Sequence, residues 1–153
     1  MKAISKKKAT ELDVDDQVVQ DRDLLAMLSR PSPFVPVILA SFSDVKAVYS
    51  VYKGTVVCRL SNILSTMTDF SENDAKFYAG CVVMALNFLH EEGVMHRRVT
   101  PECVWITSQG YGQLGDLGCS KEITGQQQFT MLGDPSYFSP EQVLARGHTH
   151  TVR

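Results

Sequence analysis

Two segments of the chain carry hydrophobic residues at the spacing of an amphipathic helix. The first runs from Thr10 to the residue before Pro31, and acidic residues near its start suit the positive end of a helix dipole. The second begins at Ser71-Glu72-Asn73-Asp74, which has the form of a capping box, and continues to Gly93. Its regularly spaced apolar residues are Phe77, Tyr78, Cys81, Val82, Ala85, Phe88 and Leu89. The pattern therefore predicts two long helices.

Shorter runs rich in valine, isoleucine and aromatic residues predict strands. The runs VILASFSD and AVYSVYK, which are connected around Ser43-Asp44-Val45-Lys46, are typical of an antiparallel hairpin. A smaller hairpin is expected from Cys103–Ile106 and Gly112–Leu114, joined by the Ser-Gln-Gly turn at 108–110.

The two ends of the chain are less regular. The opening MKAIS suits a short strand, and Lys6-Lys7-Lys8 predicts an exposed turn between this strand and the first helix. From Gly115 onward, a segment with four glycines and two prolines predicts a long loop. Strands and helices in this order predict the α+β class.

Composition narrows the classes of protein. The 153 residues are 44% hydrophobic and 21% charged, which is typical of one soluble globular domain. A formal net charge of -2 gives no basic excess, so we expect neither a nucleic-acid nor a membrane partner. The sequence shows no disulfide or zinc-site spacing among its four cysteines, at positions 58, 81, 103 and 119. It also shows no evident secretory or membrane segment. We therefore expect a cytoplasmic, reducing location within the cell.

A set of short motifs recurs in a particular order along the chain. His96-Arg97 is followed by Pro101-Glu102, then by Asp116-Leu117-Gly118 and finally by Ser139-Pro140-Glu141. In this order and spacing the chain resembles a protein kinase domain. It is most similar to the cyclic-nucleotide-dependent serine/threonine kinases of the AGC group in the stretches FYAGCVVMALNFLHEEGVMHR, QGYGQLGDLG and FTMLGDPSYFSPE.

The resemblance implies a partial protein-kinase-like fold in which a nucleotide lies between two lobes. Residues 1–54 would be the end of the small lobe, and residues 55–153 would be the first part of the helical large lobe. The family's glycine-rich phosphate loop would precede Met1, and its remaining large-lobe helices would follow Arg153. Because an incomplete domain exposes apolar faces, we expect a protein partner to cover them.

The resemblance also implies that the catalytic machinery is degenerate. Arg98 falls at the family's catalytic aspartate, and a guanidinium cannot accept the substrate proton. Cys103 falls at the asparagine that holds a second magnesium ion, where a soft thiol replaces a hard oxygen ligand. Thr100 replaces a lysine that neutralises the transferred phosphate, and Asp134 replaces a threonine that orients the catalytic loop.

Other family positions keep part of their chemistry. Lys2 falls at the phosphate-binding lysine, Asp21 at its glutamate partner, and Asp116 at the aspartate that binds magnesium. Trp105 falls beneath the adenine, where its indole would either fill part of the pocket or serve as an ordinary core aromatic. We therefore expect no resident cofactor, and at most weak binding of ATP and magnesium.

Two further positions have regulatory counterparts in the family. Thr130 matches the phosphorylation site of the activation loop, and Arg97 matches the arginine that pairs with that phosphate. Two histidines, in His148-Thr149-His150, lack a third ligand nearby and suit a solvated tail better than a metal site.

Three functions are consistent with the sequence. The first is a catalytically inactive pseudokinase that acts as an interaction or scaffold module. The second is a fragment of an AGC-type serine/threonine kinase that transfers phosphate from ATP. The third is an architectural subunit of a larger assembly. The loss of carboxylate, lysine and asparagine between residues 98 and 103 favours the first.

Overall fold

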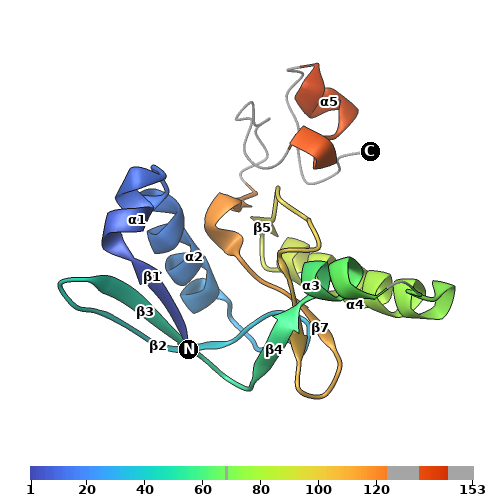
Figure 1. Cartoon of the computed structure of the whole chain (residues 1–153). Coiled ribbons are helices and arrows are strands. Elements are labelled where there is room, and N and C mark those ends of the chain that lie inside the picture. Colours follow the sequence, from blue (N-terminus) through green and yellow to red (C-terminus); the bar gives the residue numbers. More distant parts are fainter. Residues whose placement is uncertain (68, 124–134, 145–153) are drawn as a thin grey trace.

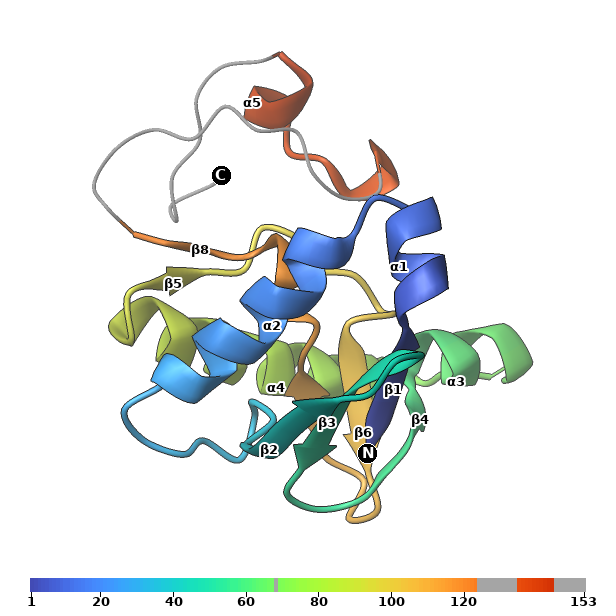
Figure 2. The same cartoon turned by 90° about the vertical axis from the view of Figure 1, so that its left-hand side faces the viewer.

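The computed structural model describes residues 1–67, 69–123 and 135–144. The N-terminal part, residues 1–54, forms a three-stranded antiparallel sheet of order β1-β3-β2 with two helices against it (Figures 1 and 2). Its elements are β1 (Lys2–Ser5), α1 (Lys6–Glu11), α2 (Asp15–Met27), β2 (Ile38–Ser43) and β3 (Ala47–Tyr52).

The C-terminal part, from residue 55, contains a second three-stranded sheet of order β4-β6-β7 and a short pair formed by β5 and β8. A long helix, α4, packs against β7. The elements of the C-terminal part are β4 (Val56–Arg59), α3 (Leu60–Thr66), α4 (Glu72–Glu91), β5 (Val94–Met95), β6 (Val104–Thr107), β7 (Gly112–Leu114), the 3₁₀ helix η1 (Leu117–Cys119), β8 (Lys121–Glu122), the 3₁₀ helix η2 (Pro135–Tyr137) and α5 (Pro140–Val143).

Helix α4 starts where the sequence predicts. The Ser71 hydroxyl accepts a hydrogen bond from the Asp74 amide at 3.1 Å, and the Asp74 carboxylate accepts one from the Ser71 amide at 3.2 Å. These bonds satisfy amides that have no partner within the first turn. The buried face of the helix consists of Cys81, Ala85, Phe88 and Leu89.

One hydrophobic core joins the two parts of the molecule. Leu24, Leu25 and Val35 of the N-terminal part belong to the same buried cluster as Leu89, Leu114 and Leu117 of the C-terminal part. Polar contacts strengthen the connection, since the Ser29 amide and hydroxyl and the Arg30 guanidinium all bond to Glu92 after α4. The end of α2 is thereby fixed against the end of α4.

The α+β class, the partial kinase-like fold, the strand at the start of the chain and both predicted hairpins are confirmed. The prediction of one helix from Thr10 is wrong, because the chain turns at Asp13, where φ is 53°. Lys6-Lys7-Lys8 is not a turn but the start of α1, capped by the Ser5 hydroxyl.

The short elements β4 and α3 were not predicted. The expected loop after Gly115 also contains regular structure, since η1 and β8 follow at once. These elements are two to seven residues long, which leaves too few positions for a hydrophobic period to emerge.

Candidate functional site

Three of the predicted site residues meet between the two parts of the molecule. Lys2 on β1 places its Nζ 2.6 Å from Asp116 Oδ1 and 3.3 Å from Asp21 Oδ2. Asp21 lies on α2, and Asp116 lies between β7 and η1. Residues separated by more than 100 positions are thus brought into one ion-pair cluster.

Asp21 also fixes α2 against η1. Its Oδ1 accepts a hydrogen bond of 2.7 Å from the backbone amide of Leu117, while its Oδ2 faces Lys2. The residue is 6% exposed, so both carboxylate oxygens have partners in a buried setting. Asp21 therefore positions both the lysine and the segment that carries Asp116.

Arg59 belongs to this cluster although the sequence did not indicate it. Its Nη1 donates to Asp116 Oδ2 at 2.8 Å and to the backbone oxygen of Glu102 at 2.6 Å. Trp105 Nε1 donates to the same Oδ2 at 3.3 Å. Both oxygens of the Asp116 carboxylate are therefore bound by donors of the protein itself.

Asp116 and Lys2 are both charged near neutral pH. Burial alone would raise the pKa of Asp116, but Lys2 and Arg59 outweigh burial and hold it below its ordinary value. Burial alone would lower the pKa of Lys2, but Asp21 and Asp116 outweigh burial and raise it above its ordinary value. The stabilising pairs are lost only in strong acid, when Asp116 takes up a proton, or in strong base, when Lys2 loses one.

Trp105 is a buried aromatic residue that also borders a cavity. Its side chain meets Tyr52 edge to face with ring centroids 5.1 Å apart, and the Lys2 ammonium lies 5.6 Å from its ring centroid. We call the adjoining space of about 440 Å³, lined by Lys2, Tyr52, Arg59 and Trp105 among others, the aromatic cavity. The indole thus packs in the core with one side toward this cavity.

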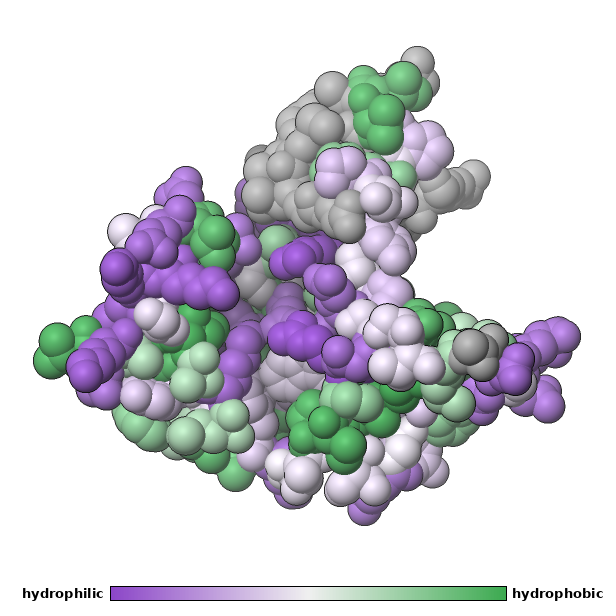
Figure 3. Space-filling view, in the orientation of Figure 1, coloured by the Kyte–Doolittle hydropathy of each residue, from purple (hydrophilic) through white to green (hydrophobic). Residues whose placement is uncertain are grey.

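A second space of about 250 Å³ is also lined by the Lys2 and Arg59 side chains. We call it the charged cavity, because Lys2, Arg59 and Arg98 line it together with Asp21 and Asp116. Figure 3 shows hydrophilic residues gathered in the hollow between the two parts of the molecule.

The segment around Arg98 is held by contacts within residues 96–103. The Arg98 amide donates to His96 Nδ1 at 3.3 Å, and its guanidinium lies 3.8 Å from the Glu102 carboxylate. Thr100 and Cys103 are buried and face each other, with the threonine hydroxyl 3.5 Å from the sulfur. Burial raises the pKa of the Cys103 thiol, so it stays protonated at neutral pH.

His96 and Arg97 hold this loop against the segment that follows β7. His96 Nε2 lies 2.9 Å from the Gly115 oxygen, and because Nδ1 accepts from Arg98, Nε2 carries the proton. Arg97 has a positive φ of 64°, and its Nε donates to the Cys119 oxygen at 2.7 Å. Its suggested phosphate partner Thr130 lies outside the described residues, as do Asp134, His148 and His150.

The buried His96 makes stability depend on pH in mild acid. Burial lowers its pKa below the ordinary 6.5, so the unfolded chain takes up a proton that the folded chain does not. The free energy of unfolding should therefore fall as pH drops below 6.5, with a limiting slope of about 1.4 kcal/mol per pH unit. In His96→Asn, the free energy of unfolding should depend less on pH than in the wild type, as measured by urea denaturation at pH 7, 6 and 5. The same pH dependence in both proteins would contradict this assignment to His96.

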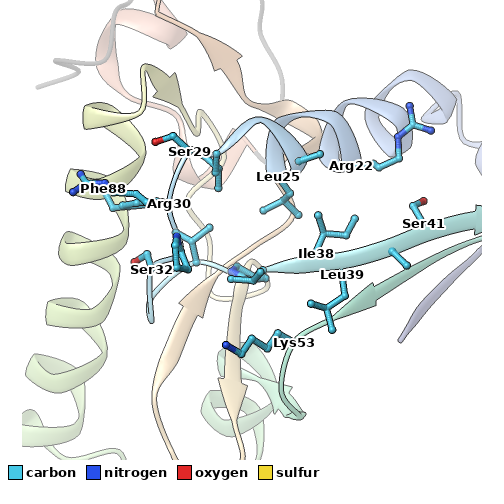
Figure 4. A pocket seen from close by; sticks show the side chains of 17 residues that line it. Arg22, Leu25, Ser29, Arg30, Ser32, Ile38, Leu39, Ser41, Lys53 and Phe88 are labelled. Carbon is cyan, nitrogen blue, oxygen red and sulfur yellow. The ribbon is translucent and has the colours of Figure 1, made fainter.

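A larger groove of about 640 Å³ lies away from this cluster, between α2, β2 and the end of α4. Figure 4 shows Arg22 and Leu25 of α2 and Ile38 and Leu39 of β2 among its lining side chains. Neither Lys2 nor Asp116 lines it, so this groove and the ion-pair cluster are separate features.

The described ranges contain neither a metal-ligand group nor a membrane-spanning helix. Within residues 1–67, 69–123 and 135–144, no three or more His, Cys, Asp and Glu side chains are grouped to hold a metal ion. In the same ranges, no helix has the length and apolar character needed to span a membrane.

Comparison with known proteins identifies the family of this chain. The protein kinase domain family matches residues 1–153. The cGMP-dependent protein kinase of Plasmodium berghei is 31% identical over 99% of this chain and 17% of its own length. Human cGMP-dependent protein kinase 2 is 33% identical over 99% of the chain and 20% of its own length. The catalytic subunit of cAMP-dependent protein kinase of Dictyostelium discoideum is 29% identical, with 99% and 23% covered. The chain therefore spans about a fifth of the length of these relatives.

Proposed function

Because this chain belongs to the protein kinase domain family, we propose that it is a kinase-fold interaction module that does not transfer phosphate. The observation that carries the proposal is the chemistry of the Asp116 carboxylate and the Arg98 loop. The carboxylate, the surviving metal ligand, is held by Lys2, Arg59 and Trp105. The position of the proton acceptor holds an arginine.

These residues do not fit a pair of magnesium ions. Magnesium requires oxygen ligands in a regular octahedron, and Asp116 would have to release Arg59 to provide one. Cys103 offers a buried, protonated thiol where the second ion needs oxygen. Arg98 adds positive charge at the same place, which opposes any incoming cation.

A manganese titration followed by electron paramagnetic resonance tests this account of the metal site. We expect no Mn²⁺ to be retained at micromolar concentration in a way that depends on Asp116. The wild-type chain and Asp116→Asn should therefore give the same amount of free ion. A site present in the wild type and absent from Asp116→Asn would overturn the account.

An interaction role is supported by apolar side chains that α4 leaves exposed. Phe77, Val83 and Met84 are 46%, 62% and 52% exposed. Large apolar side chains that a helix exposes to solvent are available for contact with another protein. We infer that this surface of α4 binds a protein partner or further residues of a longer chain.

Charge substitutions on α4 test the contact. Val83→Glu and Met84→Glu should abolish co-purification of the partner while leaving the unfolding midpoint unchanged, because both side chains already face solvent. Unchanged co-purification would reject this surface as the interface.

Two alternatives are a fragment of an active kinase and an architectural subunit. They differ from this proposal in the further residues or partner proteins that would accompany the chain. A fragment of an active kinase is compatible with relatives about five times as long. Arg98 would still remove the proton acceptor in such a protein. A role as an architectural subunit would require stable stoichiometric partners. In either case the family suggests an intracellular location.

A further inference from the structure

Strand β2 lies at a free edge of the N-terminal sheet (Figure 2). In the order β1-β3-β2 it pairs with β3 on one side, and no strand of the described residues pairs with its other side. Edge strands are usually protected by charged residues or proline, but Ile38–Ser43 contains neither. A bulge between Ile38 and Ala40 interrupts its start. The regular part of β2, from Ala40 onward, is therefore open to a further strand.

The other edges of the two sheets are less open. Strands β1 and β4 have four residues each, and each carries a charged side chain, Lys2 in β1 and Arg59 in β4. Strand β7 has three residues and packs against α4. Among the described strands, β2 is thus the edge best suited to pair with another chain.

Ser41 and Ser43 direct their backbone groups away from the sheet. Hydrogen bonds of an antiparallel ladder alternate between the two sides of a strand. The Asp44 amide donates to the oxygen of Ala47 in β3 at 3.0 Å, so the backbone groups of Phe42, two residues earlier, also face β3. The amide and carbonyl groups of the two serines, which alternate with these residues, face outward. They are the donors and acceptors that an added strand needs.

The exposed apolar side chains of this hairpin are placed symmetrically about Phe42. Phe42 is 53% exposed, Leu39 lies three residues before it with 62% exposed, and Val45 lies three residues after it with 94% exposed. When two copies of β2 pair antiparallel about Phe42, the Leu39 of each copy comes opposite the Val45 of the other. In the same register, Ser41 pairs with Ser43 of the second copy through the outward-facing groups. The hairpin therefore fits a second copy of itself.

The side chains of β2 suit this pairing. Phe42 stacks on Tyr49 of β3 with ring centroids 5.1 Å apart, so the meeting of two Phe42 rings extends the aromatic contact from one copy to the other. No charged residue lies within β2, so two copies bring no like charges opposite each other along the strand.

The charges beside β2 also favour a second copy. In the same register, Asp44 of one copy comes opposite Ala40 of the other, on the part of β2 that lines the groove of about 640 Å³. Among the described residues, this groove is lined by three cations, Arg22, Arg30 and Lys53, and by no carboxylate. Arg22 and Arg30 already pair with carboxylates outside the lining. Lys53 is left to attract the incoming Asp44.

We propose that two copies of this chain associate through antiparallel pairing of β2, so that their N-terminal sheets form one continuous sheet. The contact is isologous, because the same residues meet on both sides of a two-fold axis at Phe42. It uses neither the ion-pair cluster nor the exposed surface of α4. The proposal goes beyond the proposed function, since two copies associate in this way whether or not the chain transfers phosphate.

Sedimentation velocity over a range of chain concentrations tests the association. The contact consists of one short strand pair and its flanking apolar side chains, so we expect a small interface and a reversible dimer whose population rises with concentration. A chain that stays monomeric up to about 1 mM would overturn the proposal.

Charge substitutions at Phe42 locate the contact. Phe42→Lys and Phe42→Glu each place two like charges opposite each other at the two-fold axis, so each variant alone should associate at least about tenfold more weakly than the wild type. An equimolar mixture of the two places opposite charges there and should associate more strongly than either variant alone. Undiminished association of each single variant, or a mixture no stronger than its components, would overturn the proposal.

Leu12→Lys is the matched control. Leu12 is 61% exposed and lies outside β2, so this variant should associate as the wild type does. Val45→Lys gives a second readout that leaves the stack of Phe42 on Tyr49 intact, because Val45 is 94% exposed in the turn. It should weaken association by bringing a charge against Leu39 of the second copy. Equal affinities of Val45→Lys and Leu12→Lys would overturn the pairing about Phe42.

A cysteine at the two-fold axis tests the register. Residues that face each other without exchanging hydrogen bonds have Cα atoms about 4.5 Å apart, which lies within the range of a disulfide. Mild oxidation should therefore link two chains of Phe42→Cys, whereas Leu12→Cys and the wild type, with its four free cysteines, should stay largely unlinked. Equal yields of linked chains in the three proteins would overturn the proposed register.

Discussion

Replacing Leu117 by alanine is expected to lower the free energy of unfolding by about 2–5 kcal/mol. Leu117 is 0% exposed and belongs to the core cluster that joins the N-terminal and C-terminal parts. Removing its side chain leaves a cavity at the place where α2 meets η1, and rigid neighbours on both sides limit collapse. The effect should therefore be among the largest for any single substitution in the chain.

Leu12→Ala is the matched control for this substitution. Leu12 is 61% exposed, so the same change of side chain should alter the free energy of unfolding by less than about 1 kcal/mol. Urea denaturation of both variants measures the difference. Similar losses in the two proteins would contradict the assignment of Leu117 to the shared core.

Gly118→Ala and Gly80→Ala should change stability in opposite directions. A Cβ on Gly118 would lie 2.6 Å from the backbone oxygen of Gln17 in α2, so α2 and η1 would have to move apart. We expect a loss of about 1–3 kcal/mol, because overpacking at a rigid contact displaces backbone. A Cβ on Gly80, inside α4, meets nothing within 4 Å, and alanine should stabilise that helix by about 0.5–1 kcal/mol.

Thermal and urea denaturation of the two glycine variants give the signs directly. Stabilisation by Gly118→Ala would show that α2 does not pack as closely on η1 as the structure has it. Destabilisation by Gly80→Ala would contradict the open space that the structure leaves beside this residue.

The long helix α4 could be predicted from the sequence because its signals are local. A capping box at Ser71 starts α4, and apolar residues repeat over more than three turns from Phe77 to Leu89, so local interactions favour this helix. The meeting of Lys2, Asp21 and Asp116 was inferred from family resemblance alone, and the ion pairs at 2.6 and 3.3 Å agree with it.

Arg59 could not be found in the same way. It ends a four-residue strand, and its sequence neighbour Asn62 bonds to its backbone amide. Its partners, Asp116 and the Glu102 oxygen, lie more than 40 positions away. Only the folded chain brings the guanidinium to the carboxylate, and there Asp116 accepts an internal ion pair.

The break between α1 and α2 could not be predicted either, because it leaves the hydrophobic pattern of the sequence unchanged. Hydrophobic residues continue at nearly helical spacing from Leu12 to Leu28, and the positive φ of Asp13 leaves no mark on that pattern. An aspartate can adopt this left-handed conformation at modest cost, so the turn needs neither glycine nor proline. Tertiary packing, rather than local preference, determines where the first helix ends.

The most direct test of the account is a phosphate-transfer assay with labelled ATP and magnesium. The chain is incubated with an arginine-rich peptide, and both the peptide and the chain itself are scored for labelled phosphate, with an active cyclic-nucleotide-dependent kinase as positive control. Because Arg98 accepts no proton and Asp116 is held by Lys2 and Arg59, we predict no transfer above the heat-unfolded chain. Transfer that depends on the folded chain and disappears in Asp116→Asn would contradict the account.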